Sequence, residues 1–144
     1  MPRFMKMLNN ISRSQAVYRH GRIPAEDLQS SHYSFLLAIC REPGRSQEDL
    51  ARELCVNKST VARNINYLEE NGYVSRTPLD KRQFSVFPTE KARDILPQIR
   101  TVSREWMALL SEGISQEELD TFDSVLMRMQ DRARQIMEQQ EGCK

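Results

Sequence analysis

Residues 46–96 read SQEDLARELCVNKSTVARNINYLEENGYVSRTPLDKRQFSVFPTEKARDIL, and this stretch decides the fold. Ser46 followed by Asp49 is typical of a capping box, in which each side chain accepts a hydrogen bond from the backbone of the other. Asn57 can cap a second helix, and Gly72 can end it in the left-handed conformation. The stretch therefore predicts two short helices, 46–55 and 57–71, joined by a very tight turn, which is helix-turn-helix spacing.

The second of these helices has two different faces. Val61, Ile65 and Leu68 recur at helical spacing, so we expect them to face the core. The opposite face is polar, and a helix in this position can enter the major groove of DNA. The predicted DNA-binding residues are Asn57, Lys58, Ser59, Thr60, Arg63, Asn64 and Tyr67, with Asn66 on the same face. Arg63 has the planar fork that suits guanine O6 and N7. The alternative is the solvated outer face of an ordinary helix.

A β-hairpin is predicted directly after the second helix. Residues 73–77 and 83–87 suit a pleated surface, and 79–83 form the tip. Lys81 and Arg82 point away from any core there, and an arginine is narrow enough to enter the minor groove. Asp80 is expected to pair with a nearby arginine such as Arg76 and to fix the shape of the tip. The predicted DNA-binding residues of the wing are Arg76, Asp80, Lys81 and Arg82. A plain solvent-exposed turn is the alternative, but the order helix, turn, helix and basic hairpin favours a winged helix.

This stretch resembles the winged helix-turn-helix core of the MarR family of bacterial transcriptional regulators. The similarity lies in the run STVARNINYLEENGYV, in the DKR wing and in the helix start TEKA. The resemblance implies a two-fold dimer, most often a repressor, that binds palindromic DNA. It places Lys58, Ser59, Thr60 and Arg63 in the major groove, and Asp80 and Arg82 in the wing. Lys81 stands where arginine is frequent in the family, so the charge is kept but the bidentate geometry is lost.

Helices are predicted on both sides of this core. Apolar spacing indicates helices over 2–20 and 30–41, and a long helix over 89–112 that is capped by Thr89 and kinked by Pro97. Ser115 and Glu118 form a capping box at the start of the last helix. The apolar residues of that helix form a heptad seam: Leu119, Phe122, Leu126, Met129, Ala133 and Ile136. The expected fold class is therefore mainly α with a small β-hairpin wing, a winged helix-turn-helix plus N- and C-terminal dimerisation helices.

Three apolar helical stripes outside one compact core indicate a homodimer with a shared, isologous interface. The predicted division is an N-terminal dimerisation helix in 1–28, a DNA-binding domain in 29–90 and C-terminal dimerisation helices in 91–144. A dimer would place two recognition helices ~34 Å apart and would read a pseudo-palindrome. The alternative is that the three helices pack against one another within a single chain.

The composition is that of a soluble globular protein, because 39% of the 144 residues are hydrophobic and 28% are charged. No run approaches the ~18 apolar residues of a membrane span. The N-terminus, MPRFMKMLNN, lacks the apolar block of a signal peptide. Cys40, Cys55 and Cys143 are odd in number and form no CxxC motif, which favours free thiols in the cytoplasm.

No catalytic or cofactor-binding constellation stands out, so neither an enzyme nor a cofactor is expected. The two histidines lie apart from clustered acids, so no metal site is expected either. The resemblance implies a small aromatic or anionic effector, for which Arg13, His32 and Tyr33 are candidates, although a histidine beside a tyrosine is also common at a helix start. Two other functions stay open. One is a winged-helix protein-interaction module without DNA binding, and the other is a thiol-based redox-sensing regulator.

Overall fold

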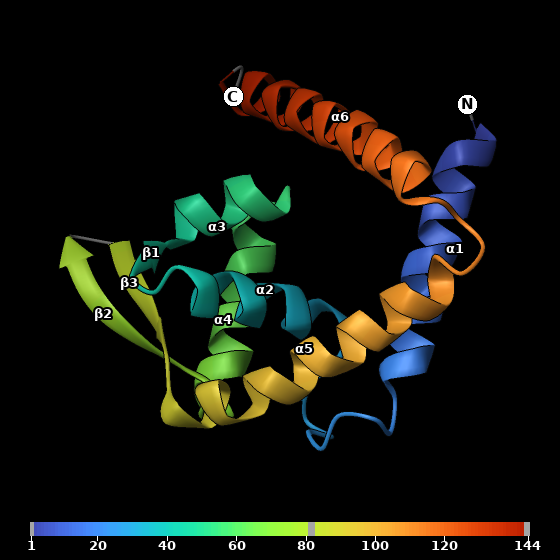
Figure 1. Cartoon of the computed structure of the whole chain (residues 1–144). Helices are drawn as coiled ribbons and strands as arrows, with labels where there is room; N and C mark the ends of the chain where they lie inside the picture. Colours follow the sequence, from blue (N-terminus) through green and yellow to red (C-terminus); the bar gives the residue numbers. More distant parts are fainter. Residues whose placement is uncertain (1, 81–82, 143–144) are drawn as a thin grey trace.

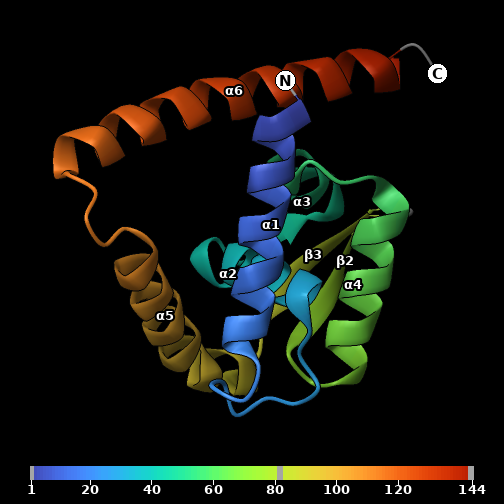
Figure 2. The ribbon, with the colours of Figure 1, turned by 90° about the vertical axis from the view of Figure 1, so that its right-hand side faces the viewer.

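The structure is a computed structural model that describes residues 2–80 and 83–142 (Figure 1). Its elements are α1 (Pro2–Arg19), α2 (Ser30–Arg41), β1 (Arg45–Ser46), α3 (Gln47–Leu54), α4 (Lys58–Glu70), β2 (Val74–Asp80), β3 (Gln83–Pro88), α5 (Glu90–Leu110) and α6 (Gln116–Gly142). They confirm the expected fold class, mainly helical with one small antiparallel sheet. α6 spans the top of the molecule, and α1 rises toward it (Figure 2). The division into domains at 28/29 and 90/91 stays a prediction.

The helix ends follow the local signals in the sequence. The Ser46 hydroxyl accepts a hydrogen bond from Asp49 N at 3.1 Å, and the Asp49 carboxylate accepts one from Ser46 N at 3.3 Å. Asn57 Oδ1 accepts from Thr60 N at 2.8 Å, which caps α4. Gly72 ends α4 with a φ of +79°, a conformation that a side chain disfavours. The predicted limits of the helix-turn-helix are therefore confirmed.

The sheet contains one strand more than the predicted hairpin. Its order is β1-β3-β2, with both pairs antiparallel. Arg45 of β1 lies opposite Val86, and Gly44 N donates a hydrogen bond to Val86 O at 2.9 Å. The strand β1 therefore joins the start of α3 to the base of the wing. Pro97 lies inside α5, which continues to Leu110, and the expected kink stays a prediction.

The core lies where α2, α3, α4, α5 and the sheet meet. Its fully buried large side chains are Leu36, Ile39, Leu50, Val61, Ile65, Leu68, Val86 and Ile99. The prediction that Val61, Ile65 and Leu68 face the core is therefore confirmed. Burial of these side chains, rather than helix propensity, stabilises α3 and α4, since isolated helices of this length are marginal in water.

The apolar seam of α6 is not covered by its own chain. Phe122 is 50% exposed, Met129 47% and Ile136 43%. Exposed large apolar side chains also occur on α1 and on the last turns of α5: Met5, Met7, Ile11, Val17, Met107, Leu109 and Leu110. The alternative in which these helices bury their stripes within one chain is therefore wrong. Within residues 2–80 and 83–142, no helix is long and apolar enough to cross a membrane.

Candidate nucleic-acid interface

The first turns of α4 present small polar groups and one arginine to solvent. Lys58, Ser59, Arg63 and Asn66 are all exposed, and we call them the exposed face of α4. Ser59 Oγ donates a hydrogen bond to Asn57 Oδ1 at 2.8 Å, so the cap residue also fixes this hydroxyl. Arg63 Nη2 donates to Thr60 Oγ1 at 3.2 Å, which holds the guanidinium along the first turn. The predicted exposure of Ser59, Arg63 and Asn66 is confirmed.

Lys58 at the start of α4 has an acidic neighbour. Its Nζ lies 3.5 Å from Glu48 Oε1 of α3, and both side chains are largely exposed. An exposed ion pair of this kind contributes at most about 1 kcal/mol. Lys58 can therefore exchange Glu48 for a phosphate at small cost.

Two residues predicted on the exposed face are buried or half-buried. Asn64 is only 8% exposed, and its amide donates a hydrogen bond to Thr60 O at 2.9 Å. Tyr67 is half-buried, and its ring stacks on His32 with 4.1 Å between the ring centroids. The predicted place of Asn64 on the outer face is therefore wrong, and a DNA contact of Tyr67 stays a prediction. Asn64 follows Val61 by three positions, so a helix of 3.6 residues per turn places the two on one side.

Arg76 supports the base of the wing. Its Nη2 and Nε lie 2.8 Å and 3.3 Å from the two carboxylate oxygens of Glu69, and its guanidinium covers the Phe84 ring at 5.3 Å. The hydrogen bond from Arg76 lowers the pKa of Glu69, and the same contact raises the pKa of Arg76. The predicted pair of Arg76 with Asp80 is therefore wrong, and a direct DNA contact of Arg76 stays a prediction. Glu69 lies in the last turn of α4 and pairs with Arg76 of the strand, whereas Asp80 is exposed at the tip.

The tip of the wing is only partly described. Leu79 is 58% exposed, and Asp80 is exposed beside it. Lys81 and Arg82 lie outside the described residues, so their contacts with DNA stay predictions. The two strands that carry them are paired from Val74–Pro88 to Asp80–Gln83. The base of the wing is therefore paired along its length, and it lies beside α4 (Figure 1).

Asp27 lies in the connector before α2, and the sequence did not predict that it connects several elements of the fold. Tyr73 Oη donates a hydrogen bond to its carboxylate at 2.6 Å, Lys91 Nζ lies 3.5 Å from it, and Tyr67 Oη donates to its backbone oxygen. Burial raises the pKa of Asp27, but the hydrogen bond from Tyr73 and the charge of Lys91 lower it further, and the net pKa is lowered. Asp27 thus ties α4, the residue before β2 and α5 to the connector after α1.

Comparison with known proteins decides the family. A family model described as "MarR family" matches residues 26–83. An uncharacterised HTH-type transcriptional regulator of Bacillus subtilis (strain 168), YybA, is 32% identical over 105 residues, which cover 72% of this chain and 70% of that relative. This chain belongs to the MarR family. It is a MarR-family transcriptional regulator, as its winged helix-turn-helix and exposed polar α4 indicate.

Solved structures of MarR-family proteins have the same architecture. A MarR transcriptional regulator from Methanosarcina mazei Go1 is 28% identical, with a TM-score of 0.80 over 92% of this chain and 90% of that one. A MarR-family regulator from Listeria monocytogenes, crystallised with 26mer DNA, is 20% identical, with a TM-score of 0.85 over 99% of this chain and 94% of that one. The second likeness shows the shared fold alone.

The structure does not gather the three candidate effector residues of this MarR-family chain into one cleft. His32 is buried and serves as a helix cap, because its Nδ1 accepts a hydrogen bond from Gln29 N at 2.9 Å. Tyr33 is 5% exposed and lies under the guanidinium of Arg19 at 4.6 Å. Arg13 is exposed on α1. A role of these three residues in effector binding stays a prediction.

The cysteines of the MarR-family chain occupy different surroundings. Burial raises the pKa of the half-buried Cys40 thiol, against the charges of Arg100 and Arg93, which disfavours the reactive thiolate. Cys55 ends α3 in the left-handed conformation, with a φ of 54°. Cys143 lies outside the described residues. In the described part of the chain, no group of three or more His, Cys, Asp or Glu side chains could hold a metal ion.

His32 should make stability depend on pH. Burial lowers its pKa, although the charge of Asp27 opposes this, so the folded state holds the proton less tightly than the unfolded state. The contribution of neutral His32 is complete above its unfolded pKa of about 6.5 and is lost as the pH falls through that value. We expect the urea midpoint to drop between pH 7.5 and 5.5, and to drop less in His32→Gln. The exposed His20 gives the matched control, His20→Gln, which should keep the wild-type dependence. An equal drop in His32→Gln and wild type would contradict this role.

Proposed function

We propose that this MarR-family regulator acts as a homodimeric repressor that binds a pseudo-palindromic operator in the cytoplasm. The observation that carries the proposal is the exposed face of α4, with Ser59 and Arg63 held in place at its first turns. Arginine forks discriminate guanine, and small hydroxyls allow close approach to phosphates and base edges. The Listeria monocytogenes regulator of the same fold, which was crystallised with 26mer DNA, supports duplex DNA as the partner.

The dimer part of the proposal is supported by the uncovered apolar surfaces of α1, α5 and α6. Contiguous apolar surface on one side of a soluble chain marks an interaction site. A two-fold arrangement lets the same helices of two chains cover each other without leaving an unpaired copy. It would also present two α4 helices to one side of a duplex, and each would read one half-site.

Phe122→Asp should weaken the dimer. The substitution places a charge on the seam of α6, where it would lose its water in the interface. Phe122 is half exposed in one chain, so the fold of the protomer should persist. We expect the dimer dissociation constant to rise by at least about tenfold, measured by sedimentation equilibrium, with a parallel loss of operator binding. Ser124→Asp, on an exposed position outside the seam, is the charge-matched control and should assemble like wild type. An unchanged dimer in Phe122→Asp would place the interface elsewhere.

Selection of bound fragments from random duplexes tests the proposal as a whole. We expect an inverted repeat whose half-sites lie about one helical turn apart, ~34 Å. Binding should weaken steeply as salt rises, because phosphate contacts release counterions. A winged-helix module that binds only proteins would recover no repeat and show no such salt dependence.

We further propose that a small effector modulates DNA binding and that it binds between α1, α2 and α5. The guanidinium of Arg19 lies half-buried over the Tyr33 ring, and its Nε is buried without a hydrogen-bond partner among the described residues. Burial lowers the pKa of Arg19, against the charge of Tyr33. Tyr18 is the residue before Arg19 on α1. Its ring centroid lies 5.3 Å from that of Trp106, and the guanidinium of Arg22 covers its ring. Cations beside aromatic rings suit a small anionic aromatic ligand.

A further inference from the structure

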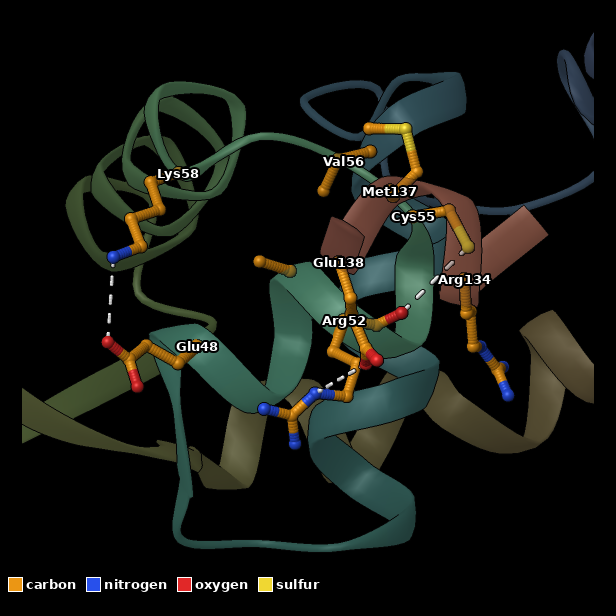
Figure 3. Close-up of a pocket in the computed structure, with 9 residues that line it drawn as sticks. Glu48, Arg52, Cys55, Val56, Lys58, Arg134, Met137 and Glu138 are labelled. Atoms are coloured by element: carbon orange, nitrogen blue, oxygen red, sulfur yellow. Dashed lines mark hydrogen bonds and ion pairs between the residues drawn. The ribbon is translucent and has the colours of Figure 1, made fainter. Parts of the chain in front are cut away.

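The C-terminal half of α6 returns to the helix-turn-helix of its own chain. It lies over α3, on the side of the molecule away from α5 (Figure 1). Between α3, the turn into α4 and α6 there is a cavity of about 200 Å³. Figure 3 shows the polar side chains that cross this junction from both helices. The junction links a helix with an uncovered apolar seam directly to the unit that carries α4.

Two polar contacts hold α6 against α3. Arg52 Nε lies 3.2 Å from Glu138 Oε1, and Arg134 Nη2 donates a hydrogen bond to the backbone oxygen of Glu53 at 3.3 Å. Arg134 and Glu138 are four residues apart, so they project from one face of α6. We call the four residues Arg52, Glu53, Arg134 and Glu138 the α3–α6 latch.

The chemistry of Arg134 explains why it reaches the backbone of α3. The Glu53 carboxylate already pairs with Arg41 and Arg45, so it is not the partner of Arg134. The Glu53 carbonyl lies in the last turn of α3, where carbonyl groups have no partner within the helix and carry the negative end of the helix dipole. Arg134 of α6 therefore supplies a hydrogen-bond donor to a free carbonyl group at the end of α3. This end lies only a few residues before the start of α4.

We infer that the α3–α6 latch sets the distance between the two α4 helices of the dimer, so that Arg52, Arg134 and Glu138 are positioning residues that select the spacing of the half-sites. This inference rests on the proposed dimer and its pseudo-palindromic site. α3 and α4 share one core through Leu50 and Val61, so a shift of α3 carries α4 with it. Because the dimer has a two-fold axis, a shift of α4 in each protomer changes the separation of the two α4 helices by twice that shift. A base pair rises ~3.4 Å, so a shift of only ~1.7 Å in each protomer changes the spacing by one base pair.

The latch is expected to affect spacing much more than stability. The side chains of Arg52 and Glu138 are 61% and 53% exposed, and exposed ion pairs stabilise proteins weakly. Its loss should leave the core intact and let α3 and α4 take several positions relative to α6. A purely structural pair would behave differently, since its loss would lower the melting temperature and leave the preferred spacing unchanged.

The test uses the full chain with inverted repeats whose half-site separation is varied one base pair at a time. Wild type should prefer one separation. We expect Glu138→Arg to bind that separation about fivefold more weakly and to lose most of the preference, with little change in melting temperature. The charge-reversed pair Arg52→Glu/Glu138→Arg should restore the preference. Glu138→Arg adds positive charge, so a general electrostatic effect would act in the opposite direction and strengthen binding.

Asp123→Arg is the matched control, because it makes the same change of charge on an exposed position of α6 about 22 Å along the helix from Glu138. It should keep the wild-type separation. If Glu138→Arg keeps the preference of wild type, or if the charge-reversed pair does not restore it, the latch does not set the spacing. If wild type itself shows no preference for any inverted repeat, it is the proposed function that fails.

Discussion

Arg63→Ala should weaken binding to the selected operator by about 1–3 kcal/mol, or roughly 5- to 150-fold, and relax the preference for the base that the arginine reads. Arg63 is exposed on α4, and its contact with Thr60 Oγ1 at 3.2 Å aims the guanidinium along the first turn. Alanine removes the bidentate donor, and no neighbouring cation of α4 can replace its planar geometry. Fluorescence anisotropy with the cognate duplex and with single-base variants measures both effects.

The effect of Arg63 has to be separated from that of charge alone. Arg93→Ala removes the same side chain from an exposed position of α5 and should bind the operator nearly as wild type does. The slope of the logarithm of affinity against the logarithm of salt concentration should change little in Arg93→Ala. In a variant that loses one phosphate contact, the slope should become shallower by about one. If Arg63→Ala binds the cognate site and its variants like wild type, α4 does not read bases through this residue.

Ile65→Ala should lower the free energy of unfolding by about 2–5 kcal/mol. Ile65 is fully buried on the inner side of α4, where it packs with Leu50 and Leu68, and alanine would leave a cavity that the surroundings fill only in part. Urea unfolding followed by circular dichroism measures the loss. The protein concentration has to be held constant, because the stability of a dimer depends on it.

The neighbouring position provides the comparison for Ile65. Asn66 is exposed, and Asn66→Ala should change the free energy of unfolding by less than about 0.5 kcal/mol. The two substituted positions are adjacent in α4, but Ile65 faces the core and Asn66 faces solvent. A loss of similar size in both would mean that α4 is not packed with Ile65 inward.

Much of the helix-turn-helix could be predicted because its signals are local. Caps such as Ser46–Asp49 and Asn57–Thr60 depend on residues three apart, and the inward face of α4 follows from the helical period. The edge of that face is harder to predict. Asn64 has a polar side chain but lies inward, because its position on the helix decides its burial and its amide finds a partner in the backbone.

The features that could not be predicted depend on partners distant in sequence or on very short elements. Asp27 meets Tyr73 across 46 positions, and no periodicity links the two. Glu69 and Asp80 are both near Arg76 in sequence, and the packing of α4 against β2 makes Glu69 the partner. β1 has two residues and no pattern of its own, so its pairing with β3 becomes visible only in the folded chain.

The short strand β1 has a mechanical consequence for a protein that must adjust to DNA. It runs directly into α3 and is hydrogen-bonded to the wing strand β3, so the wing cannot swing on a hinge of its own. A push on the wing tip by the sugar–phosphate chain is passed through β3 and β1 to α3. Each winged helix-turn-helix unit therefore meets the duplex with its wing and α3 joined, and any accommodation to a bent or over-wound operator has to come from movement of this unit against the rest of the dimer or from the DNA itself.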